Sequence, residues 1–200
     1  MGKTDTKTIL LDANEWAARR HGHDGFSYAD LSKRVGIRTA SIHYHFPAKA
    51  DLITALMARY KNEVAENLAQ IIQQQHTGGT QILRFPDLYR TGLNGGVTLC
   101  LCVALSVGRD TLAKATLQQI FDFRGQTLVW LQEVFARSEQ DGSIRAVYNP
   151  SAKAAAALAL VEGAQISARS EQNLQRFDRA TDLMRQRLHT DPPAGLTILP

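Results

Sequence analysis

The sequence predicts an all-α protein of about nine helices. Apolar residues recur at spacings of three and four along most of the 200 residues, which is the period of an amphipathic helix. Clusters of Gly, Pro, Asn and Asp separate these stretches, and no run of alternating β-branched residues indicates a strand. With 44% hydrophobic and 21% charged residues, the composition is globular and excludes a chain that is disordered throughout.

Four helices are expected in the first 75 residues, over 4–20, 27–35, 39–46 and 48–75. Ser27 is a suitable N-cap for the second helix, and Asp30 at its third position completes a capping box. Gly36 ends that helix, because glycine tolerates a positive φ. Pro47 stops the third helix.

The rest of the chain continues in the same way. Thr77-Gly78-Gly79-Thr80 predicts a loop, and a helix follows over 82–93 with Pro86 in a first turn after a break. After a turn at 94–96, we expect an apolar helix over 97–108 and a long amphipathic one over about 111–138. After the turn at Asp141-Gly142-Ser143, Asn149-Pro150-Ser151 opens an Ala-rich helix to about Asn173, and a last helix covers roughly 174–189, ended by Asp191-Pro192-Pro193.

Positive charge is concentrated near the start of the chain. Residues 1–60 hold nine of the 23 Lys and Arg residues but only six of the 19 Asp and Glu residues, and the net charge of the whole chain is +4. A polyanion partner is therefore sought in the first third. The polar start lacks the apolar stretch of a signal peptide, and the longest apolar stretch, 97–107, is too short to span a bilayer. We expect a cytoplasmic protein without a membrane partner.

Residues 27–46 predict a helix-turn-helix. Two short helices are joined by Gly36-Ile37-Arg38, and apolar residues suited to locking them together are Leu31, Val35, Ile37, Ile42 and Phe46. The second helix of such a pair lies in the major groove of double-stranded DNA. Its polar side chains can bond to phosphates and base edges; they are Thr39, Ser41, His43, Tyr44, His45 and, just beyond, Lys49.

The run from Gly25 to Leu52 (GFSYADLSKRVGIRTASIHYHFPAKADL) resembles the TetR family of bacterial transcriptional regulators. The resemblance implies a helix-turn-helix domain over 1–47 and an effector-binding and dimerisation domain over 48–200. It further implies phosphate contacts for Ser27, Tyr28 and Lys49, and base contacts for the residues that open the recognition helix, Thr39, Ala40 and Ser41. His43 departs modestly from the family's aromatic contact residue, and Tyr44 and His45 match its aromatic-His pair of backbone contacts.

The resemblance also implies a homodimer on a palindromic operator, since three or four side chains per recognition helix read too few bases alone. The run 162–169 resembles the penultimate helix, which forms a four-helix interface with the last one. The interface residues expected here are Ala157, Gly163, Ala164, Ala168, Phe177 and Met184. Intrachain packing is the alternative interpretation of these residues.

Family effector sites lie between the helices of the C-terminal domain. Candidate lining residues for a small, fairly hydrophobic effector are Tyr89, Leu93, Cys102, Leu105, Phe121, Phe123, Trp130 and Gln165.

Cys100 and Cys102 allow two interpretations. Either they are small buried apolar residues, or one thiol lines the effector pocket and reacts. The segment Thr98 to Cys102, followed by Ala104-Leu105, resembles a TetR subgroup that senses enones, acrylate-like molecules or oxidants. On a helix, residues two apart point about 200° apart. That spacing disfavours a disulfide between the cysteines and a shared metal at His43 and His45.

These observations predict a ligand-responsive repressor, released from its operator by a small, fairly apolar or electrophilic effector. We expect neither a metal nor a cofactor. One alternative is a DNA-binding protein without sequence preference. Its affinity for DNA would fall steeply with salt concentration and would differ little between sequences. The other is an α-helical enzyme. No acid/base or nucleophile cluster stands out in the sequence, so enzymatic activity is not expected.

Overall fold

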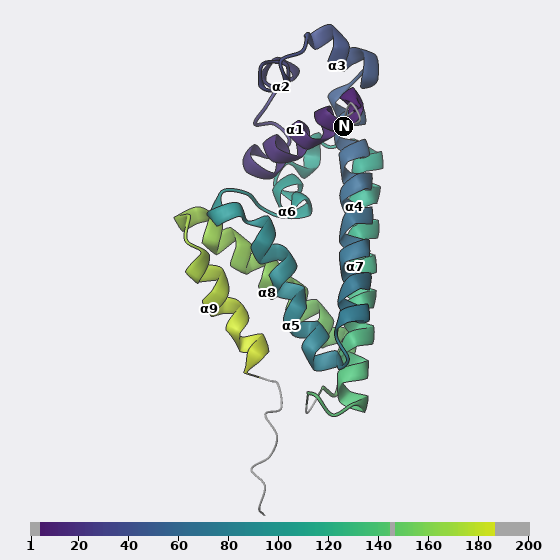
Figure 1. Cartoon of the computed structure of the whole chain (residues 1–200), viewed down its shortest axis with the longest axis vertical. Helices are drawn as coiled ribbons and strands as arrows, with labels where there is room; N and C mark the ends of the chain where they lie inside the picture. The colour runs from purple at the N-terminus through teal and green to yellow at the C-terminus, as the bar shows by residue number, and fades with distance from the viewer. Residues whose placement is uncertain (1–4, 145–146, 187–200) are drawn as a thin grey trace, which may run out of the picture.

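A computed structural model describes residues 5–144 and 147–186 of the chain. Within them it contains nine α-helices and two short 3₁₀ turns (Figure 1), which confirms the all-α prediction. The helices are α1 (Thr6–His21), α2 (Tyr28–Val35), α3 (Thr39–His45), α4 (Lys49–Gln74), α5 (Gly78–Gly92), α6 (Leu101–Ser106), α7 (Lys114–Gln140), α8 (Pro150–Glu171) and α9 (Leu174–Arg185), and the 3₁₀ turns are η1 (Asn94–Gly96) and η2 (Arg109–Thr111).

Helices α2 and α3 form one end of the molecule, with α1 beneath them (Figure 1). The Ser27 hydroxyl accepts from Asp30 N–H and the Asp30 carboxylate accepts from Ser27 N–H, so the predicted capping box is present. Gly36 ends α2 in the left-handed region, with φ 75°. Leu31 and Ile42 are buried and hold α2 and α3 to the core. The helix-turn-helix geometry therefore follows from local signals in the sequence.

The long helices α4 and α7 run side by side, and α5, α8 and α9 form the other side of the body (Figure 1). A continuous apolar core runs from α1 to α9, and Leu10, Leu52, Phe85 and Phe177 are among its fully buried side chains. No single helix in the described ranges has the length and apolarity to cross a membrane. The bent pair Gly78–Gly92 and Asn94–Ser106, which meets at 47°, has them only when taken together.

The prediction of a loop at 77–80 is wrong, because Gly78 and Gly79 form the first turn of α5. Thr77 is the N-cap and accepts from Thr80 N–H. Gly78 N–H donates to Asp141 Oδ2 and Gly79 N–H to Ser143 Oγ, so the turn after α7 supplies partners for the start of α5. Glycines are poor helix formers, and here these long-range partners override that preference.

Two more expectations around α5 and α6 need correction. Pro86 lies inside α5, beyond its first turn, where it has no N–H to donate to the carbonyl one turn earlier. The apolar helix expected over 97–108 is shorter, because α6 begins only at Leu101. Cys100 precedes it in an extended conformation, with φ −51° and ψ 140°. The two cysteines therefore do not share a helix, and the 200° argument does not apply to them.

Other boundaries agree with the expectations to within a few residues, including α7, α8 and the Asn149 cap, whose side chain accepts from Ala152 N–H. The last helix begins at Leu174 as expected and is described as far as Arg185. The rest of its expected length, to residue 189, and the stop at Asp191-Pro192-Pro193 lie outside the described residues.

Replacing Gly78 by Ala should destabilise the fold. A Cβ at Gly78 would lie 2.4 Å from the backbone nitrogen of Ser138, so α5 and α7 would have to move apart. We expect the free energy of unfolding, measured by urea titration, to fall by about 1–3 kcal/mol. Gly125→Ala is the matched control, since a Cβ there meets nothing within 4 Å and improves helix propensity by up to about 1 kcal/mol. Equal effects of the two variants would contradict the packing argument.

Candidate functional site

Helix α3 presents a polar face to solvent at the end of the molecule. Ala40, His43 and Tyr44 are exposed, Tyr44 to 85%, and Thr39, Ser41 and His45 are partly exposed. The rings of Tyr44 and His45 meet edge to face at 5.2 Å. Ile42 on the opposite side is completely buried. The predicted base-contacting residues Thr39, Ala40 and Ser41 are therefore all at least partly accessible, as the start of a recognition helix requires.

Ser27 and Tyr28 already have partners inside the chain. Besides accepting from the Asp30 backbone, the Ser27 hydroxyl donates to the Asp30 carboxylate at 2.6 Å. The Tyr28 hydroxyl donates to the carbonyl of Phe46 at 2.9 Å, and its ring meets that of His43 edge to face at 4.8 Å. Burial, and then the nearby Asp51 carboxylate, raise the pKa of Tyr28 to about 12. Tyr28 thus fixes the angle between α2 and α3 and stays protonated.

Lys49 points inward rather than toward a phosphate. Its Nζ donates to the carbonyls of His23 and Phe26 and lies 4.1 Å from the centre of the Phe26 ring. Burial lowers the pKa of Lys49, and the Asp24 and Asp30 carboxylates partly oppose that shift. The Lys49 ammonium therefore holds the loop between α1 and α2 in place, and its phosphate contact stays a prediction that this geometry does not favour.

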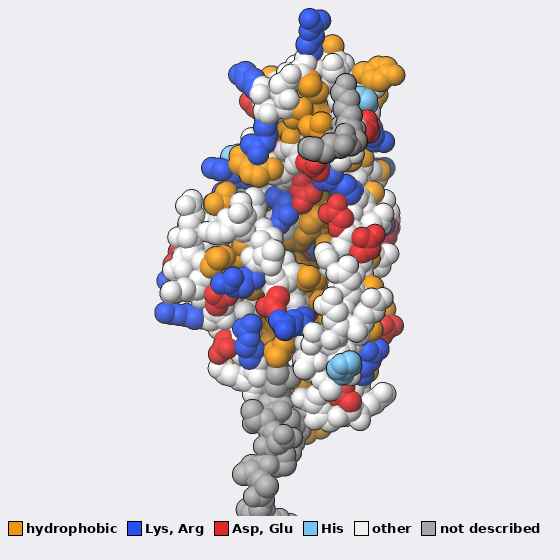
Figure 2. All heavy atoms as spheres, in the orientation of Figure 1, with side chains coloured by type: hydrophobic (Ala, Val, Ile, Leu, Met, Phe, Trp, Pro, Cys, Tyr) orange, Lys and Arg blue, Asp and Glu red, His pale blue; other side chains and the backbone are white. Residues whose placement is uncertain are grey.

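Sequence reasoning missed Arg38 as a candidate contact. It is the exposed N-cap residue of α3. With Thr6 of α1, Arg38 lines a shallow groove beside the recognition helix, together with Ile37, Ala40, Ser41, Tyr44 and His45. Figure 2 shows Lys and Arg side chains around this end of the molecule. The sequence signal for Arg38 was its position directly before the expected recognition helix, because a cation at that position can reach DNA phosphates. Arg34 is different, since it stacks on Trp16 at 3.7 Å.

A second cluster of chemistry-bearing groups is buried in the body. The Tyr60 hydroxyl donates to Cys100 Sγ at 3.2 Å, and Cys102 Sγ lies 3.9 Å from Met57 Sδ. The Cys100 backbone N–H donates to the side-chain oxygen of Gln165 at 2.7 Å. Both thiols are buried and free. The structure therefore brings together groups from α4, the start of α6 and α8.

The two thiols differ in acidity. Hydrogen bonding from the Cys102 side chain, aided by the Tyr60 hydroxyl and opposed by burial, lowers the pKa of Cys100 to about 7. Burial raises the pKa of Cys102 well above its usual range. Because the thiolate is the nucleophilic form, the lower pKa favours Cys100 over Cys102 as a nucleophile.

Polar atoms without partners also lie in the core, two of them, on Tyr89 and Gln165, beside this thiol cluster. Tyr89 Oη, Gln165 Nε2 and Trp130 Nε1 are buried and make no hydrogen bond to any described group. Leaving such donors unpaired costs about 1–3 kcal/mol each. A cavity of about 190 Å³ between α1, α4 and α5 reaches Tyr60 and Tyr89 from outside. This part of the interior therefore contains polar groups without hydrogen-bond partners and lies next to a cavity that opens to solvent.

Seven of the eight predicted effector residues are buried in this part of the body. They are Tyr89, Leu93, Cys102, Leu105, Phe123, Trp130 and Gln165. The prediction for Phe121 is wrong, because its side chain is 71% exposed. Phe121 and Phe123 lie two residues apart on α7 and so point about 200° apart. Only Phe123 can face the interior.

Comparisons with known proteins agree with this arrangement. The sequence profile described as "Bacterial regulatory proteins, tetR family" matches residues 10–56, which contain α2 and α3. A TetR-family transcriptional regulator from Agrobacterium tumefaciens is 27% identical, with a TM-score of 0.86 over 92% of this chain and 97% of that one.

Residues 10–56 therefore carry the TetR-family sequence pattern, and the chain has the fold of a TetR-family regulator.

Two further solved structures show the same family fold. A TetR regulator from Legionella pneumophila is 25% identical, with a TM-score of 0.83 over 94% of this chain and 100% of that one. The reduced form of E. coli NemR is 20% identical, with a TM-score of 0.79 over 96% of this chain and 100% of that one. No curated protein sequence matched the chain. In the ranges 5–144 and 147–186, no three His, Cys, Asp or Glu side chains gather as metal ligands.

Most of the residues predicted for the TetR dimer interface lie inside the single chain. Ala157, Ala164, Ala168, Phe177 and Met184 are buried where α8 and α9 pack on each other and on the core. Gly163 alone of the six is exposed. Small residues also allow close packing within one chain, so the Ala-rich pattern alone does not identify the outer face of α8, and the dimer interface stays a prediction.

The inward role of Lys49 predicts a stability effect. Lys49→Met should lower the free energy of unfolding by about 1–3 kcal/mol, since two carbonyls lose a charged donor. Urea titration of the full chain measures this change. Lys33→Met is the control, because Lys33 is exposed on α2 and its loss should change stability by less than about 0.5 kcal/mol. If Lys49→Met impairs DNA binding at unchanged stability, its main role is a phosphate contact instead.

Proposed function

We propose that this regulator is a homodimeric repressor that a small effector releases from a palindromic operator. The observation that carries the proposal is a direct connection between the thiol cluster and the DNA-binding end. Arg19 of α1 donates through Nε to the carbonyl of Leu99 at 2.8 Å, and Leu99 N–H donates back to the carbonyl of Arg19 at 3.0 Å. Leu99 is the residue before Cys100. In this proposal, a displacement of Cys100 is passed to α1 through the Arg19–Leu99 pairing.

Four further contacts of Arg19 and Arg59 strengthen this connection. Arg19 also donates to the carbonyl of Gly92 at the end of α5, at 2.6 Å, and to Glu15 at 2.9 Å. Arg59 of α4 pairs with Asp12 and Glu15 of α1, at 2.6 and 2.8 Å. Helix α1 is thus attached to α4, α5 and the segment before α6. We propose residues 1–47 as the DNA-binding domain and 48–200 as the effector and dimerisation domain.

In this proposal the exposed face of α3 reads the operator. Thr39, Ala40 and Ser41 face bases, His43, Tyr44 and His45 contact bases or phosphates, and Arg38 adds a phosphate contact. Ser27 and Tyr28 mainly set the position of α3, and their contacts to the DNA phosphates contribute less than that positioning. Two copies whose recognition helices lie about 34–36 Å apart would fit successive major grooves. An effector acts by favouring a state in which they do not.

A gel shift at physiological salt tests sequence-specific binding. DNA from upstream of the regulator's own gene should bind far more tightly than a scrambled duplex. Tyr44→Ala should weaken binding to both duplexes about tenfold, because Tyr44 matches a backbone contact and phosphate contacts do not depend on sequence. Tyr148→Ala is the matched control, because Tyr148 is 88% exposed and lies outside the helix-turn-helix. Equal affinity for both duplexes would instead support a DNA-binding protein without sequence preference.

For the effector we propose a small electrophile that reacts with Cys100. An enone fits this chemistry: the Cys100 thiolate forms a carbon–sulfur bond to the β-carbon, and the displaced π electrons take up a proton at the α-carbon. The unpaired donors of Tyr89 and Gln165 can hold the carbonyl oxygen. Since Cys100 is 3% exposed, an adduct needs space that the closed core lacks, which displaces the Leu99–Cys100 segment from Arg19.

Treating the protein–operator complex with an enone should release the DNA, as followed by fluorescence anisotropy. The release rate should rise through about pH 7, because that is the pKa of Cys100 and the reactive thiolate forms above it. Cys100→Ser should stay bound. Cys102→Ala should respond more slowly at pH 7, because losing its hydrogen bond raises the pKa of Cys100. A double Cys→Ser variant that responds unchanged would exclude thiol sensing.

For the dimer we propose the outer face of α8. Ala155, Ala159, Gly163 and Ile166 are exposed along one side of this helix, Ile166 to 55%. Phe121 of α7 is exposed to 71%. The ion pair of Arg124 and Glu162, at 3.0 Å, holds α7 beside α8 at this level. Small and apolar side chains on a helix pair allow a second copy to approach closely.

Gly163→Glu should therefore produce monomers, as measured by light scattering. A Cβ at Gly163 meets nothing within 4 Å in the single chain, so the subunit itself should stay folded, and circular dichroism can check this. The introduced carboxylates would face each other across the two-fold axis. Gln70→Glu, on the exposed side of α4, adds the same charge and should remain dimeric. A dimeric Gly163→Glu protein would place the interface elsewhere.

A further inference from the structure

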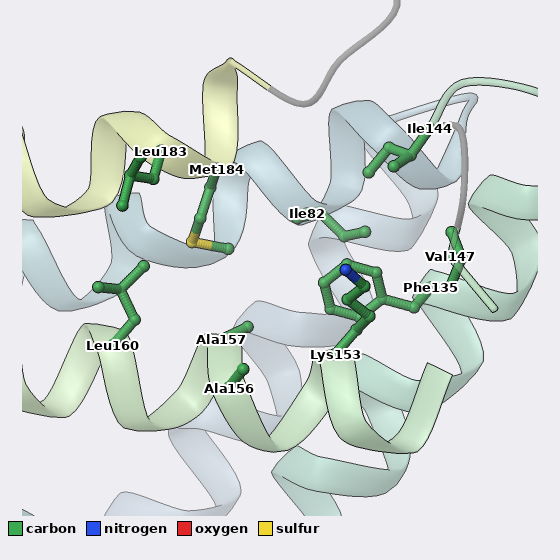
Figure 3. A pocket seen from close by; sticks show the side chains of 10 residues that line it. All are labelled: Ile82, Phe135, Ile144, Val147, Lys153, Ala156, Ala157, Leu160, Leu183 and Met184. Carbon is green, nitrogen blue, oxygen red and sulfur yellow. The ribbon is translucent and has the colours of Figure 1, made fainter. Parts of the chain in front are cut away.

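An apolar cavity lies at the end of the body away from the helix-turn-helix, between α5, α7, α8 and α9 (Figure 3). Nine of its ten lining residues are apolar, among them Ile82, Phe135, Leu160 and Met184. Its volume is about 120 Å³, whereas a single water needs roughly 10–15 Å³ by the same measure. The cavity can therefore hold a short chain of carbon atoms.

Among the described residues of the lining, Lys153 is the only charged one. Figure 3 shows its amine directed toward Ile82 and Phe135, over the cavity rather than away from it. Among the described residues, no carboxylate lies within ion-pair distance of Lys153. A cation at an apolar wall loses hydration unless an anion pairs with it. The cavity thus offers an apolar volume with one unpaired positive charge.

This cavity is separate from the thiol cluster. Along α5, Ile82 lines the cavity, Phe85 follows one turn later, and Tyr89 lies at the thiol cluster. Phe85 stacks on Trp130 of α7, with ring centres 5.8 Å apart, and meets Tyr89 edge to face at 5.1 Å. This buried aromatic layer lies between the two sites, so a ligand in the cavity does not reach Cys100.

We propose that this cavity is a binding site for a small amphiphilic carboxylate, with its hydrocarbon chain among Ile82, Phe135 and Met184 and its carboxylate on Lys153. Charge complementarity selects the anion, since Lys153 is the one charged side chain among the lining residues that the structure describes. The size of the cavity selects a short chain over a long fatty acyl group. Leu183, half exposed on α9, and Ala156, exposed on α8, lie at the rim where the ligand enters.

Calorimetric titration of the full chain with octanoate tests the site. We expect saturable binding of one octanoate per chain, and binding of octanol at least about tenfold weaker, because the alcohol lacks the charge that pairs with Lys153. Lys153→Met should lower the affinity for octanoate to that for octanol. Lys114→Met, which removes an exposed lysine at the start of α7, should change neither affinity.

A second variant keeps the test independent of Lys153. Ala156→Phe places a ring at the rim of the cavity and should abolish binding of both ligands, while thermal unfolding confirms that the protein is folded. The double Cys→Ser protein should bind octanoate normally, so failure of thiol sensing does not affect this result. The proposal is overturned if octanoate binding does not saturate, or if the Lys153→Met and Lys114→Met variants bind octanoate with equal affinity. It is also overturned if Ala156→Phe changes the oligomeric state and leaves octanoate binding unchanged, because the cavity would then be an interface between copies.

Discussion

The reciprocal pairing of Arg19 with Leu99 is the constraint on which the rest of this structure depends. It joins the last turn of α1 to an extended segment that no helix would otherwise hold, and the same guanidinium reaches the end of α5 through Gly92. A guanidinium suits this task because its donors form a rigid fork that can meet several acceptors at once. The extended segment then delivers Cys100 to Tyr60 and Gln165. One side chain thus sets both the position of the DNA-binding end and the surroundings of the thiol.

Local signals made the helix-turn-helix predictable. Ser27, Asp30 and Gly36 act within a few residues of one another, so their roles follow from the sequence alone. The start of α5 was not predictable in this way. Gly78 and Gly79 are typical loop residues, and their helical state depends on Asp141 and Ser143, more than 60 positions away. The same holds for Cys100, whose extended backbone is fixed by Arg19 and Gln165 rather than by its neighbours.

The candidate sites show the same division. The period of α3 identified its exposed face, but the direction of Lys49 depends on two loop carbonyls that no pattern reveals. Periodicity also could not choose the outward face of α8, since small residues occur on every side of this helix. Burial decided it, and moved the expected contact surface from Ala164 and Ala168 to Gly163 and Ile166. The unpaired donors of Tyr89 and Gln165 could be found only in three dimensions, because their significance is the lack of a neighbour among the described residues.

The placement of the two tryptophans gives the molecule an internal pair of optical reporters. Trp16 lies in α1, partly exposed, with the Arg34 and Arg20 guanidinium groups 3.7 and 5.0 Å from its ring. Trp130 is buried against Phe85 in the body. The chain has no other tryptophan. Emission from the first should be accessible to ionic quenchers and sensitive to DNA, and emission from the second should be shielded and sensitive to the core. Events at the two ends of the regulator can therefore be followed separately in the unlabelled protein.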